Sequence, residues 1–199
     1  RIIARPFVGQ SKETFKRTTN RHDYALKPFA KTTLDSLSEA GFDVLAVGKI
    51  YDIFDGEGIT KTSRSKSNRE GMEITINHLN DDFTGICFTN LVDFDAIYGH
   101  RRNTLGYKNA IEEFDAQIGE FIEKMTEEDL LIITADHGND PTHHGTDHTR
   151  ELVPVIFYHK NIEGKELGTL KSFACIAQTI CENFDVKKPT IGKSVLKEL

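Results

Sequence analysis

This sequence of 199 residues lacks several features that define common classes of protein. No apolar run approaches the length of about 20 residues that a membrane-spanning helix needs, so no membrane association is expected. Positive charge does not predominate, because the net charge is −6 and the isoelectric point is about 5.8, which argues against a general nucleic-acid binder. Internal repeats and low-complexity tracts are absent as well. The composition, 38% hydrophobic and 28% charged, predicts a globular chain of one domain, or of one domain and a fragment, with small and soluble partners.

Cysteine is scarce, with only Cys87, Cys175 and Cys181. Their number is odd, no C-x-x-C pair occurs and all three lie in apolar segments, so we expect buried free thiols rather than disulfides. Free thiols are typical of a reducing compartment, and we therefore predict a cytoplasmic protein. A starting Met and a signal-like segment are also lacking before the strand-like residues 2–8, so we expect the chain to begin inside a longer protein.

Apolar periodicity predicts an α/β fold. Helices are expected over residues 28–40, 67–79, 107–125 and 170–184, and strands over residues 44–50, 85–92, 130–134 and 153–158. This alternation indicates a mostly parallel sheet flanked by helices. The first 27 residues are more polar and richer in turn formers, and Pro28 marks the expected boundary.

Potential metal ligands are dense between residues 134 and 151. The stretch holds four histidines and three aspartates: His137, His143, His144, His148, Asp136, Asp140 and Asp147. Imidazole and carboxylate ligands together suit divalent ions such as zinc and manganese. The apolar residues 130–133 would place Asp136 and His137 at the carboxyl end of a strand, where open α/β sheets bind their ligands.

A second cluster repeats this pattern, because the apolar residues 86–92 are followed by Asp93, Asp95 and His100. Two strands that each end in an acid and a histidine can pool their ligands into a paired metal centre, which suits phosphoryl transfer. The alternative is that Asp-His-Gly forms an ordinary turn without a ligand. The occurrence of two such clusters after two buried strands favours the metal centre.

Several cations lie near these clusters in the sequence. Arg101, Arg102 and Arg150 adjoin the histidines, and Lys49 ends a predicted apolar strand, where a lone charge would need a partner. These side chains are candidates for neutralising a phosphate. A further basic segment comprises Lys61, Arg64, Lys66 and Arg69, which we interpret as a solvated, mobile loop in preference to a guide for anionic substrates.

Six stretches carry a resemblance to a known family. They read RIIARPFVG, RHDYALKP, VGKIYDIFDGEGIT, FTNLVDFDAIYGHRR, TADHGNDPT and GTDHTRE. Together they resemble the carboxyl-terminal half of the prokaryotic phosphopentomutases, a family of the alkaline phosphatase superfamily. Other members, among them the cofactor-independent phosphoglycerate mutases, share DHG, whereas VGKIYDIF and DFDAIYGHRR are more specific. The resemblance implies a three-layer α/β core with a mostly parallel sheet, in which residues 28–199 are the carboxyl-terminal part and residues 1–27 are the end of a cap domain and its return linker.

The resemblance also implies a set of site residues. A first divalent ion, expected to be manganese, would take Asp95, His100 and His148, and a second would take Asp136 and His137. The pentose phosphate would contact Lys49, Arg1 and Ile3, and a sugar bisphosphate would act as activator. His143 and His144 are then loop residues, while Asp93 and Asp140 either orient the ligating imidazoles or have a structural role.

The implied reaction interconverts ribose (or deoxyribose) 1-phosphate and 5-phosphate through a phosphorylated threonine. That threonine and an aspartate of the second metal site belong to the amino-terminal half of the family, so no catalytic nucleophile is expected in this chain and the fragment alone is expected to be inactive. The missing half is its expected partner. Asn103 departs from the family, which has an acid there. Another enzyme of the superfamily, such as a phosphoglycerate mutase or phosphodiesterase, and a non-catalytic metal-binding domain are the alternatives.

Overall fold

The computed structural model describes residues 2–18 and 22–199 and confirms the predicted α/β class. The strands are β1 (Ile2–Ala4), β2 (Phe7–Val8), β3 (Lys16–Arg17), β4 (His22–Tyr24), β5 (Asp43–Val47), β6 (Lys61–Ser63), β7 (Gly85–Thr89), β8 (Leu131–Thr134) and β9 (Val155–Tyr158). The helices are α1 (Thr33–Glu39), α2 (Ile50–Phe54), α3 (Asn68–His78), α4 (Thr104–Lys124), α5 (Ala174–Asn183), the π-helix η1 (Phe94–Gly99) and the 3₁₀-helix η2 (Leu196–Glu198).

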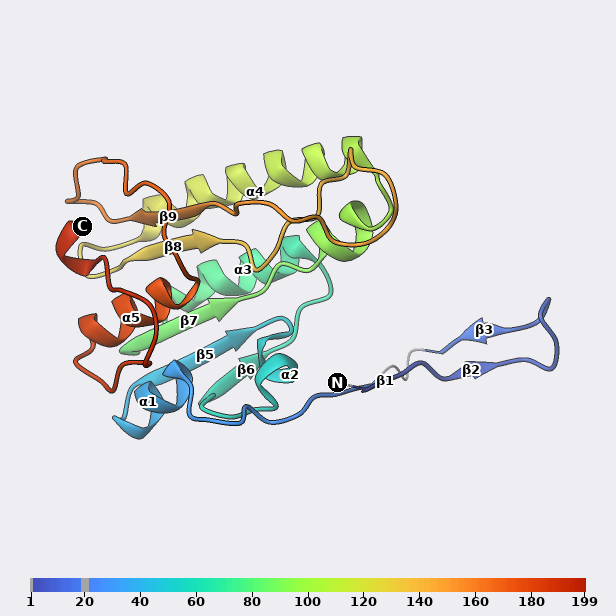
Figure 1. Ribbon diagram of the computed structural model, residues 1–199, viewed down its shortest axis with the longest axis horizontal. Helices are drawn as coiled ribbons and strands as arrows, with labels where there is room; N and C mark the ends of the chain where they lie inside the picture. The colour runs from blue at the N-terminus through green and yellow to red at the C-terminus, as the bar shows by residue number, and fades with distance from the viewer. Residues whose placement is uncertain (1, 19–21) are drawn as a thin grey trace.

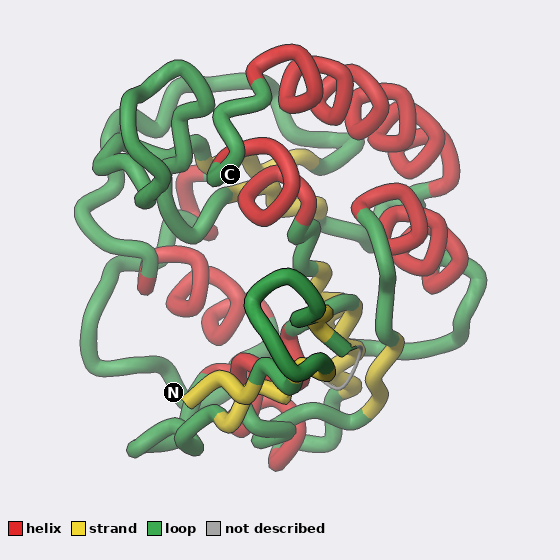
Figure 2. The backbone as a smooth tube through the Cα atoms, turned by 90° about the vertical axis from the view of Figure 1, so that its right-hand side faces the viewer, coloured by secondary structure: helices red, strands yellow, loops and turns green. Residues whose placement is uncertain are grey.

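The centre of the molecule is a parallel sheet in the order β6-β5-β7 (Figure 1). In its register, Leu45 pairs with Lys61 on one side and with Cys87 on the other. Residues 44–47 of β5 are buried, as expected for a middle strand covered on both faces. Helices α3 and α4 lie on one face of the strands, and α1 and α5 lie on the other (Figure 2). The predicted layers of helix, sheet and helix are therefore present.

Strand β9 runs antiparallel to its neighbour β8, with Leu131 opposite Tyr158, whereas the sequence predicted a mostly parallel arrangement. The connection explains the difference. A parallel neighbour requires a crossover, usually a helix, but residues 135–154 contain no helix and return the chain directly beside β8.

Two apolar clusters hold the helices to the strands. In the first, Leu34, Leu37 and Val44 are buried against side chains near the carboxyl terminus, including Phe184, whose ring centroid lies 4.8 Å from that of Phe42. In the second, Ile76 and Phe121 pack with Met125 and with Leu131 of β8. The clusters thus join α1 to α5 and α3 to α4 across different parts of the sheet.

Local signals explain where the elements begin. Helix α1 starts at residue 33 rather than 28, because Thr32 caps it and the Asp35 carboxylate accepts the Thr32 backbone N–H at 2.6 Å. The strand expected over residues 44–50 stops at Val47, since Gly48 takes a left-handed φ of +79° and a Cβ there would lie 2.6 Å from the Asn90 carbonyl oxygen. Helix α2 and strand β6 were not predicted.

The first strands form an antiparallel ribbon that extends away from the body (Figure 1). Strand β1 pairs with β4, and β2 pairs with β3. The single strand expected over residues 2–8 is interrupted at Arg5 and Pro6, because proline has no backbone N–H to donate to a ladder. Phe7 and Phe15 are exposed on the ribbon and contact each other edge to face, with their ring centroids 4.8 Å apart.

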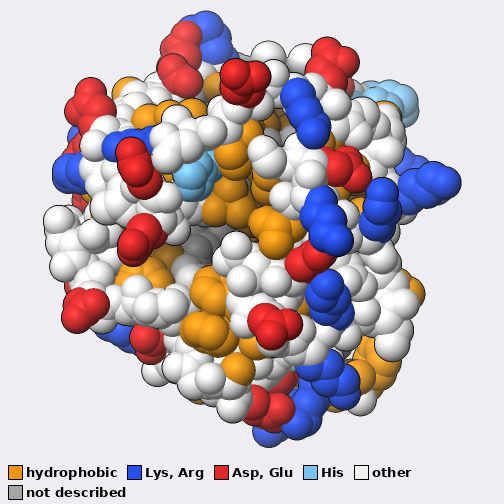
Figure 3. Space-filling view, turned by 90° about the vertical axis from the view of Figure 1, so that its left-hand side faces the viewer, with side chains coloured by type: hydrophobic (Ala, Val, Ile, Leu, Met, Phe, Trp, Pro, Cys, Tyr) orange, Lys and Arg blue, Asp and Glu red, His pale blue; other side chains and the backbone are white. Residues whose placement is uncertain are grey.

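A large apolar cleft separates β7 from β8. It has a volume of about 2750 Å³, and Figure 3 shows hydrophobic side chains in a hollow of the surface. Its lining includes Ile86 and Phe88 of β7, Ile132 of β8, Phe114 and Phe121 of α4, and Ile176 of α5. Within the described ranges, β7 pairs only with β5 and β8 only with β9, so each strand turns an unpaired edge towards this space. Among the helices of those ranges, none has the length and apolar character to cross a membrane.

Candidate metal centre

Asp95 reaches the site from the segment that follows β7. The Asp93 carboxylate accepts the Asn68 backbone N–H at 2.7 Å, and the Asp93 backbone N–H donates to the Asn68 side chain at 2.8 Å. This reciprocal pair ties the start of η1 to the start of α3. The chain then winds into the π-helix, a form that is rare and frequent at functional sites, with Asp95 in its first turn and His100 just after its end.

The histidine-rich loop, residues 135–154 between β8 and β9, carries Asp136, His137 and His148. Strand β8 leads into Asp136 and His137, and an isolated antiparallel bridge between Gly138 and Thr149 folds the far side of the loop against the near side. The bridge places the ring of His148 on that of His137, with stacked centroids 3.7 Å apart.

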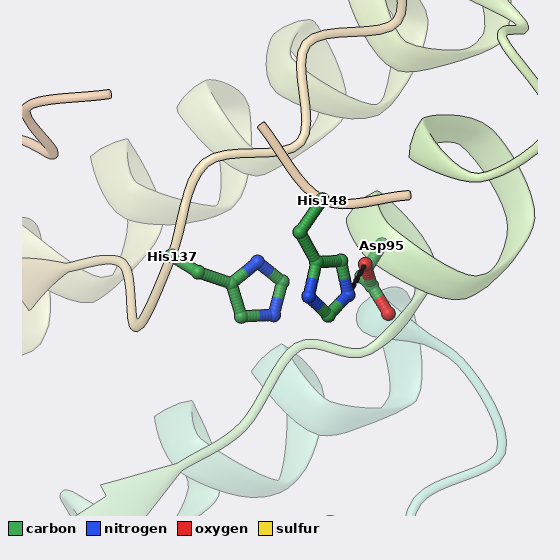
Figure 4. A group of neighbouring side chains, drawn as sticks. All are labelled: Asp95, His137 and His148. Carbon is green, nitrogen blue, oxygen red and sulfur yellow. Dashed lines mark ion pairs between the residues drawn. The ribbon is translucent and has the colours of Figure 1, made fainter. Parts of the chain in front are cut away.

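The side chains of the two segments converge (Figure 4). The Nε2 atom of His148 lies 3.2 Å from the Oδ1 atom of Asp95, and the Nε2 atom of His100 lies 3.4 Å from the same oxygen. Asp95, His137 and His148 each offer a ligand atom, and these atoms lie within 4.8 Å of one another. That spacing surrounds one point from several sides, as the ligands of a single ion must.

Backbone carbonyls orient the imidazole rings. His100 Nδ1 lies 2.5 Å from the carbonyl oxygen of Thr146, and His137 Nδ1 lies 3.2 Å from that of Gly138. Because a carbonyl oxygen can only accept, each Nδ1 carries a proton, and in the neutral form of the ring Nε2 is then the atom that can bind a metal ion. A neutral imidazole held in this way, beside a carboxylate, is a donor set that suits a divalent metal ion.

The structure groups the expected ligands differently from the resemblance. Asp95, His100 and His148, assigned to a first ion, do lie together. His137, assigned to a second ion, also stacks on His148, while Asp136 is 80% exposed and, among the described residues, pairs only with His137 Nε2, at 3.6 Å. The described residues therefore build one well-surrounded position and only part of a second.

The remaining polar residues of the loop lie outside this group. His143 and His144 are exposed and contact each other, with ring centroids 4.3 Å apart. The Asp140 carboxylate accepts from the hydroxyl and the backbone N–H of Thr142, and these bonds, the hydroxyl first, lower the pKa of Asp140. In the described ranges neither Asp93 nor Asp140 hydrogen-bonds an imidazole, so their observed hydrogen bonds fit the structural role, which is one of the two roles that the sequence left open.

The expected substrate contacts are dispersed. Lys49 is half-buried at the start of α2, two residues past the end of β5, and it lines the same cleft as Asp95, His100 and His148. Ile3 is half-buried in β1 on the ribbon. Arg1 lies outside the described residues.

The basic segment carries ion pairs on the surface. Lys61 lies in β6 and pairs with Asp81 at 3.1 Å, Arg64 pairs with Asp52 at 3.2 Å, and Arg69 pairs with Glu73 at 3.3 Å. Lys66 donates its backbone N–H to the Glu70 carboxylate at 2.6 Å. Part of the segment is therefore an ordered strand edge rather than a loop.

Sequence reasoning missed two residues beside the metal centre. Asn139 is buried and donates its side-chain N–H to Asp95 Oδ1 at 2.6 Å. Arg102, expected near a phosphate, instead donates to the histidine-rich loop. No sequence signal identifies these roles, because the partners of both lie about 40 residues away.

Comparisons with known proteins bear on this site. Residues 8–188 match the model of the Metalloenzyme superfamily. The chain is 58% identical, over 202 aligned positions, to proteins named phosphopentomutase from Clostridium botulinum strain Alaska E43 and Clostridium perfringens strain 13, and 57% identical to one from Clostridium tetani. Each alignment covers 100% of this chain and 51% of the relative. The chain thus spans about half the length of the curated relatives it matches.

Proposed function

Because this chain belongs to the Metalloenzyme superfamily, we propose that it is the carboxyl-terminal part of a phosphopentomutase, an isomerase that interconverts pentose 1-phosphate and 5-phosphate. The observation that carries the proposal is the convergence of Asp95, His100 and His148 on one point in the lining of the cleft. The 58% identity to phosphopentomutases over the whole chain supports the choice of reaction.

Asp95, His100 and His148 would hold a first divalent ion, and Asp136 and His137 would contribute to a second. Manganese suits this mixture of imidazole nitrogen and carboxylate oxygen. Bound ions would polarise the phosphoryl oxygens and stabilise the charge that develops in phosphoryl transfer. Because Asp136 is exposed and pairs with no described residue other than His137, the second position would take further ligands from the amino-terminal half.

Other residues of this chain would orient the metal ligands and bind the substrate. His100 and His137 keep their Nε2 lone pairs aimed at the site, because the carbonyls of Thr146 and Gly138 hold the protons on Nδ1. Lys49, half-buried on the same cleft, would neutralise a phosphate of the pentose substrate. Ile3 and Arg1 are the further candidates for contact with the sugar phosphate, and a sugar bisphosphate is the proposed activator.

The missing half of the protein would supply what this half lacks. The phosphorylated threonine and the remaining carboxylate would come from the amino-terminal part, and the unpaired edges of β7 and β8 leave an apolar cleft between them where its strands fit. Residues 1–27 would be the end of a cap domain and its return linker, and residues 28–199 the carboxyl-terminal part of the core. We keep the cytoplasm as the proposed location, in line with three free cysteines.

The test is an assay of the full-length protein with manganese, a catalytic amount of sugar bisphosphate, and either ribose 1-phosphate or phosphoglycerate. We expect rapid formation of ribose 5-phosphate and little turnover of phosphoglycerate. The opposite preference would assign the protein to another reaction of the superfamily, and manganese binding without turnover of either substrate would support a non-catalytic metal-binding domain.

His148→Ala and His143→Ala form a matched pair in the same assay. Both remove an imidazole from the same loop, but only His148 faces Asp95, at 3.2 Å. Loss of a ligand should weaken manganese binding and lower turnover by a factor of at least about 100, since a misplaced phosphoryl group reacts slowly. His143→Ala should change both by less than about threefold. Equal effects of the two substitutions would rule out the proposed ligand set.

A further inference from the structure

The Arg102 side chain donates hydrogen bonds to both segments that carry the candidate metal ligands. Its guanidinium donates to the carbonyl oxygens of Gly145 at 2.5 Å, Asp140 at 2.7 Å and Asp147 at 2.6 Å, all in the histidine-rich loop. It also donates to the Gly99 carbonyl at 3.2 Å, at the end of η1. One side chain thus joins the segment that carries Asp95 and His100 to the segment that carries His148.

A second path runs from Arg102 through Asn139 to the carboxylate of the site. Arg102 donates to Asn139 Oδ1 at 2.8 Å, and Asn139 Nδ2 donates to Asp95 Oδ1 at 2.6 Å. The Asn139 side chain can lie this close to η1 because residue 99 is glycine. A Cβ at this position would lie 2.5 Å from Asn139 Nδ2. The carboxylate oxygen that faces both imidazoles is therefore oriented by an amide that Arg102 itself holds.

The backbone of Arg102 has an unusual conformation. Its φ is +51°, in the left-handed region that residues other than glycine rarely adopt. Such a conformation persists only where surrounding contacts stabilise it. The five hydrogen bonds of the guanidinium supply those contacts.

We propose that Arg102 is a positioning residue of the metal centre, which sets the affinity for the first divalent ion by fixing the histidine-rich loop and, through Asn139, the Asp95 carboxylate. This inference rests on the proposed function, and it differs from the expectation that Arg102 binds the substrate phosphate. The direction in which a substitution of Arg102 changes metal affinity separates the contribution of its charge from that of the geometry it maintains. A nearby positive charge repels a cation, so removal of the charge alone would tighten metal binding, whereas loss of the geometry weakens it.

The experiment uses the full-length protein and Mn²⁺ alone as the probe, titrated by calorimetry. Arg102→Gly removes the guanidinium and also relieves the left-handed backbone, so any weakening cannot come from backbone strain. Arg102→Lys keeps the charge but loses the planar fork that reaches several carbonyls. Lys108→Met on α4 is the matched control, because it removes one positive charge from a side chain that pairs with Glu112 on the exposed face of the helix.

We expect both Arg102 variants to raise the dissociation constant of the first Mn²⁺ by about 10- to 100-fold, the range found when residues that orient metal ligands are replaced. Amide hydrogen exchange of residues 143–149 should become faster in both variants and stay unchanged in Lys108→Met. At saturating Mn²⁺, KM for ribose 1-phosphate should remain within about twofold of the wild-type value, since Arg102 does not contact the phosphate in the proposed arrangement.

Manganese affinity within threefold of the wild type in Arg102→Lys, with unchanged exchange in the loop, would overturn the inference. A raised KM at full metal occupancy would overturn it in favour of phosphate binding. If Arg102→Gly does not fold, Arg102→Lys and Gly99→Ala provide the test. The added Cβ of Gly99→Ala displaces Asn139 and leaves Arg102 in place. Failure of the wild-type protein to bind Mn²⁺ would count against the proposed function itself.

Discussion

At the scale of the residue, burial controls the chemistry of the cysteine on β7. Desolvation raises the pKa of the Cys87 thiol from 9.0 to about 11, and a hydrogen-bond contact with Thr89 only partly opposes this. The protonated thiol is therefore favoured in the folded protein at neutral and mildly alkaline pH. Because the thiolate is the reactive species, Cys87 should be an inert residue of the sheet.

We predict that alkylation of Cys87 by iodoacetamide in the folded full-length protein rises about tenfold per pH unit from pH 8 to 10 without levelling off. In protein unfolded by urea, the rate should level off above about pH 9. At pH 9 the folded thiolate fraction is roughly 50-fold smaller, which follows from a pKa difference of about two units. Mass spectrometry of the Cys87 peptide gives both rates, and a folded-state profile that levels off near pH 9 would contradict the prediction.

The residues of the site were predictable where residue type itself determines the chemistry. Residue type pointed to the two clusters that contain Asp95, His100 and His148, because few side chains ligate metals, and the family resemblance selected these three within the clusters. The role of Arg102 was not predictable, because its acceptors are backbone carbonyls, which every residue has, and because the loop that offers them is about 40 positions away. The grouping of His137 with His148 likewise depends on a bridge between Gly138 and Thr149 that no local pattern signals.

At the scale of the element, helices with strong local signals were predictable and short edge elements were not. Helix α3 occupies residues 68–78, within the expected range of 67–79, and α4 begins three residues before its expected start. Strand β6 has three polar residues, Lys61, Thr62 and Ser63, which give no apolar strand pattern. Its strand conformation comes from pairing with β5, a contact between distant residues that periodicity does not report.

The start of α3 provides a test of a local signal. Ser67 Oγ accepts the backbone N–H of Glu70 at 3.2 Å, which satisfies one of the amides that the first turn leaves open. We predict that Ser67→Ala lowers the free energy of unfolding by about 1 kcal/mol, whereas Ser67→Asn, which can accept the same bond, changes it by a few tenths. Urea unfolding of the full-length protein gives both values. Equal losses in the two variants would show that the cap contributes little.

At the scale of the whole molecule, the position of the cleft matters more than its size. It lies between the unpaired edges of β7 and β8, so that within the described ranges it separates the parallel sheet from the β8-β9 pair. An apolar cleft of this size is unusual for a chain that functions alone, since exposed apolar surface promotes association. The relatives have about twice the length of this chain, and we propose that the additional half fills the cleft.

We predict that the 199-residue chain alone has no mutase activity with manganese and sugar bisphosphate, because it holds only part of the second metal site and lacks the threonine. Adding the amino-terminal half as a separate chain should restore turnover and raise solubility. The measurement is conversion of ribose 1-phosphate by the fragment, by the fragment that carries His137→Ala, and by the mixture. Turnover by the fragment alone, above that of the fragment with His137→Ala, would contradict the dependence on the missing half.

The contact between α1 and α5 has a consequence for synthesis on the ribosome. Leu37 is completely buried in a cluster that includes Ile180 and Phe184, more than a hundred residues later in the chain. At about 5–20 residues per second, roughly 7–30 s pass between the synthesis of the apolar face of α1 and the synthesis of its partner. Contacts of such long range also slow folding, because the intervening chain must close first. The apolar face of α1 is therefore open to non-native association during this interval.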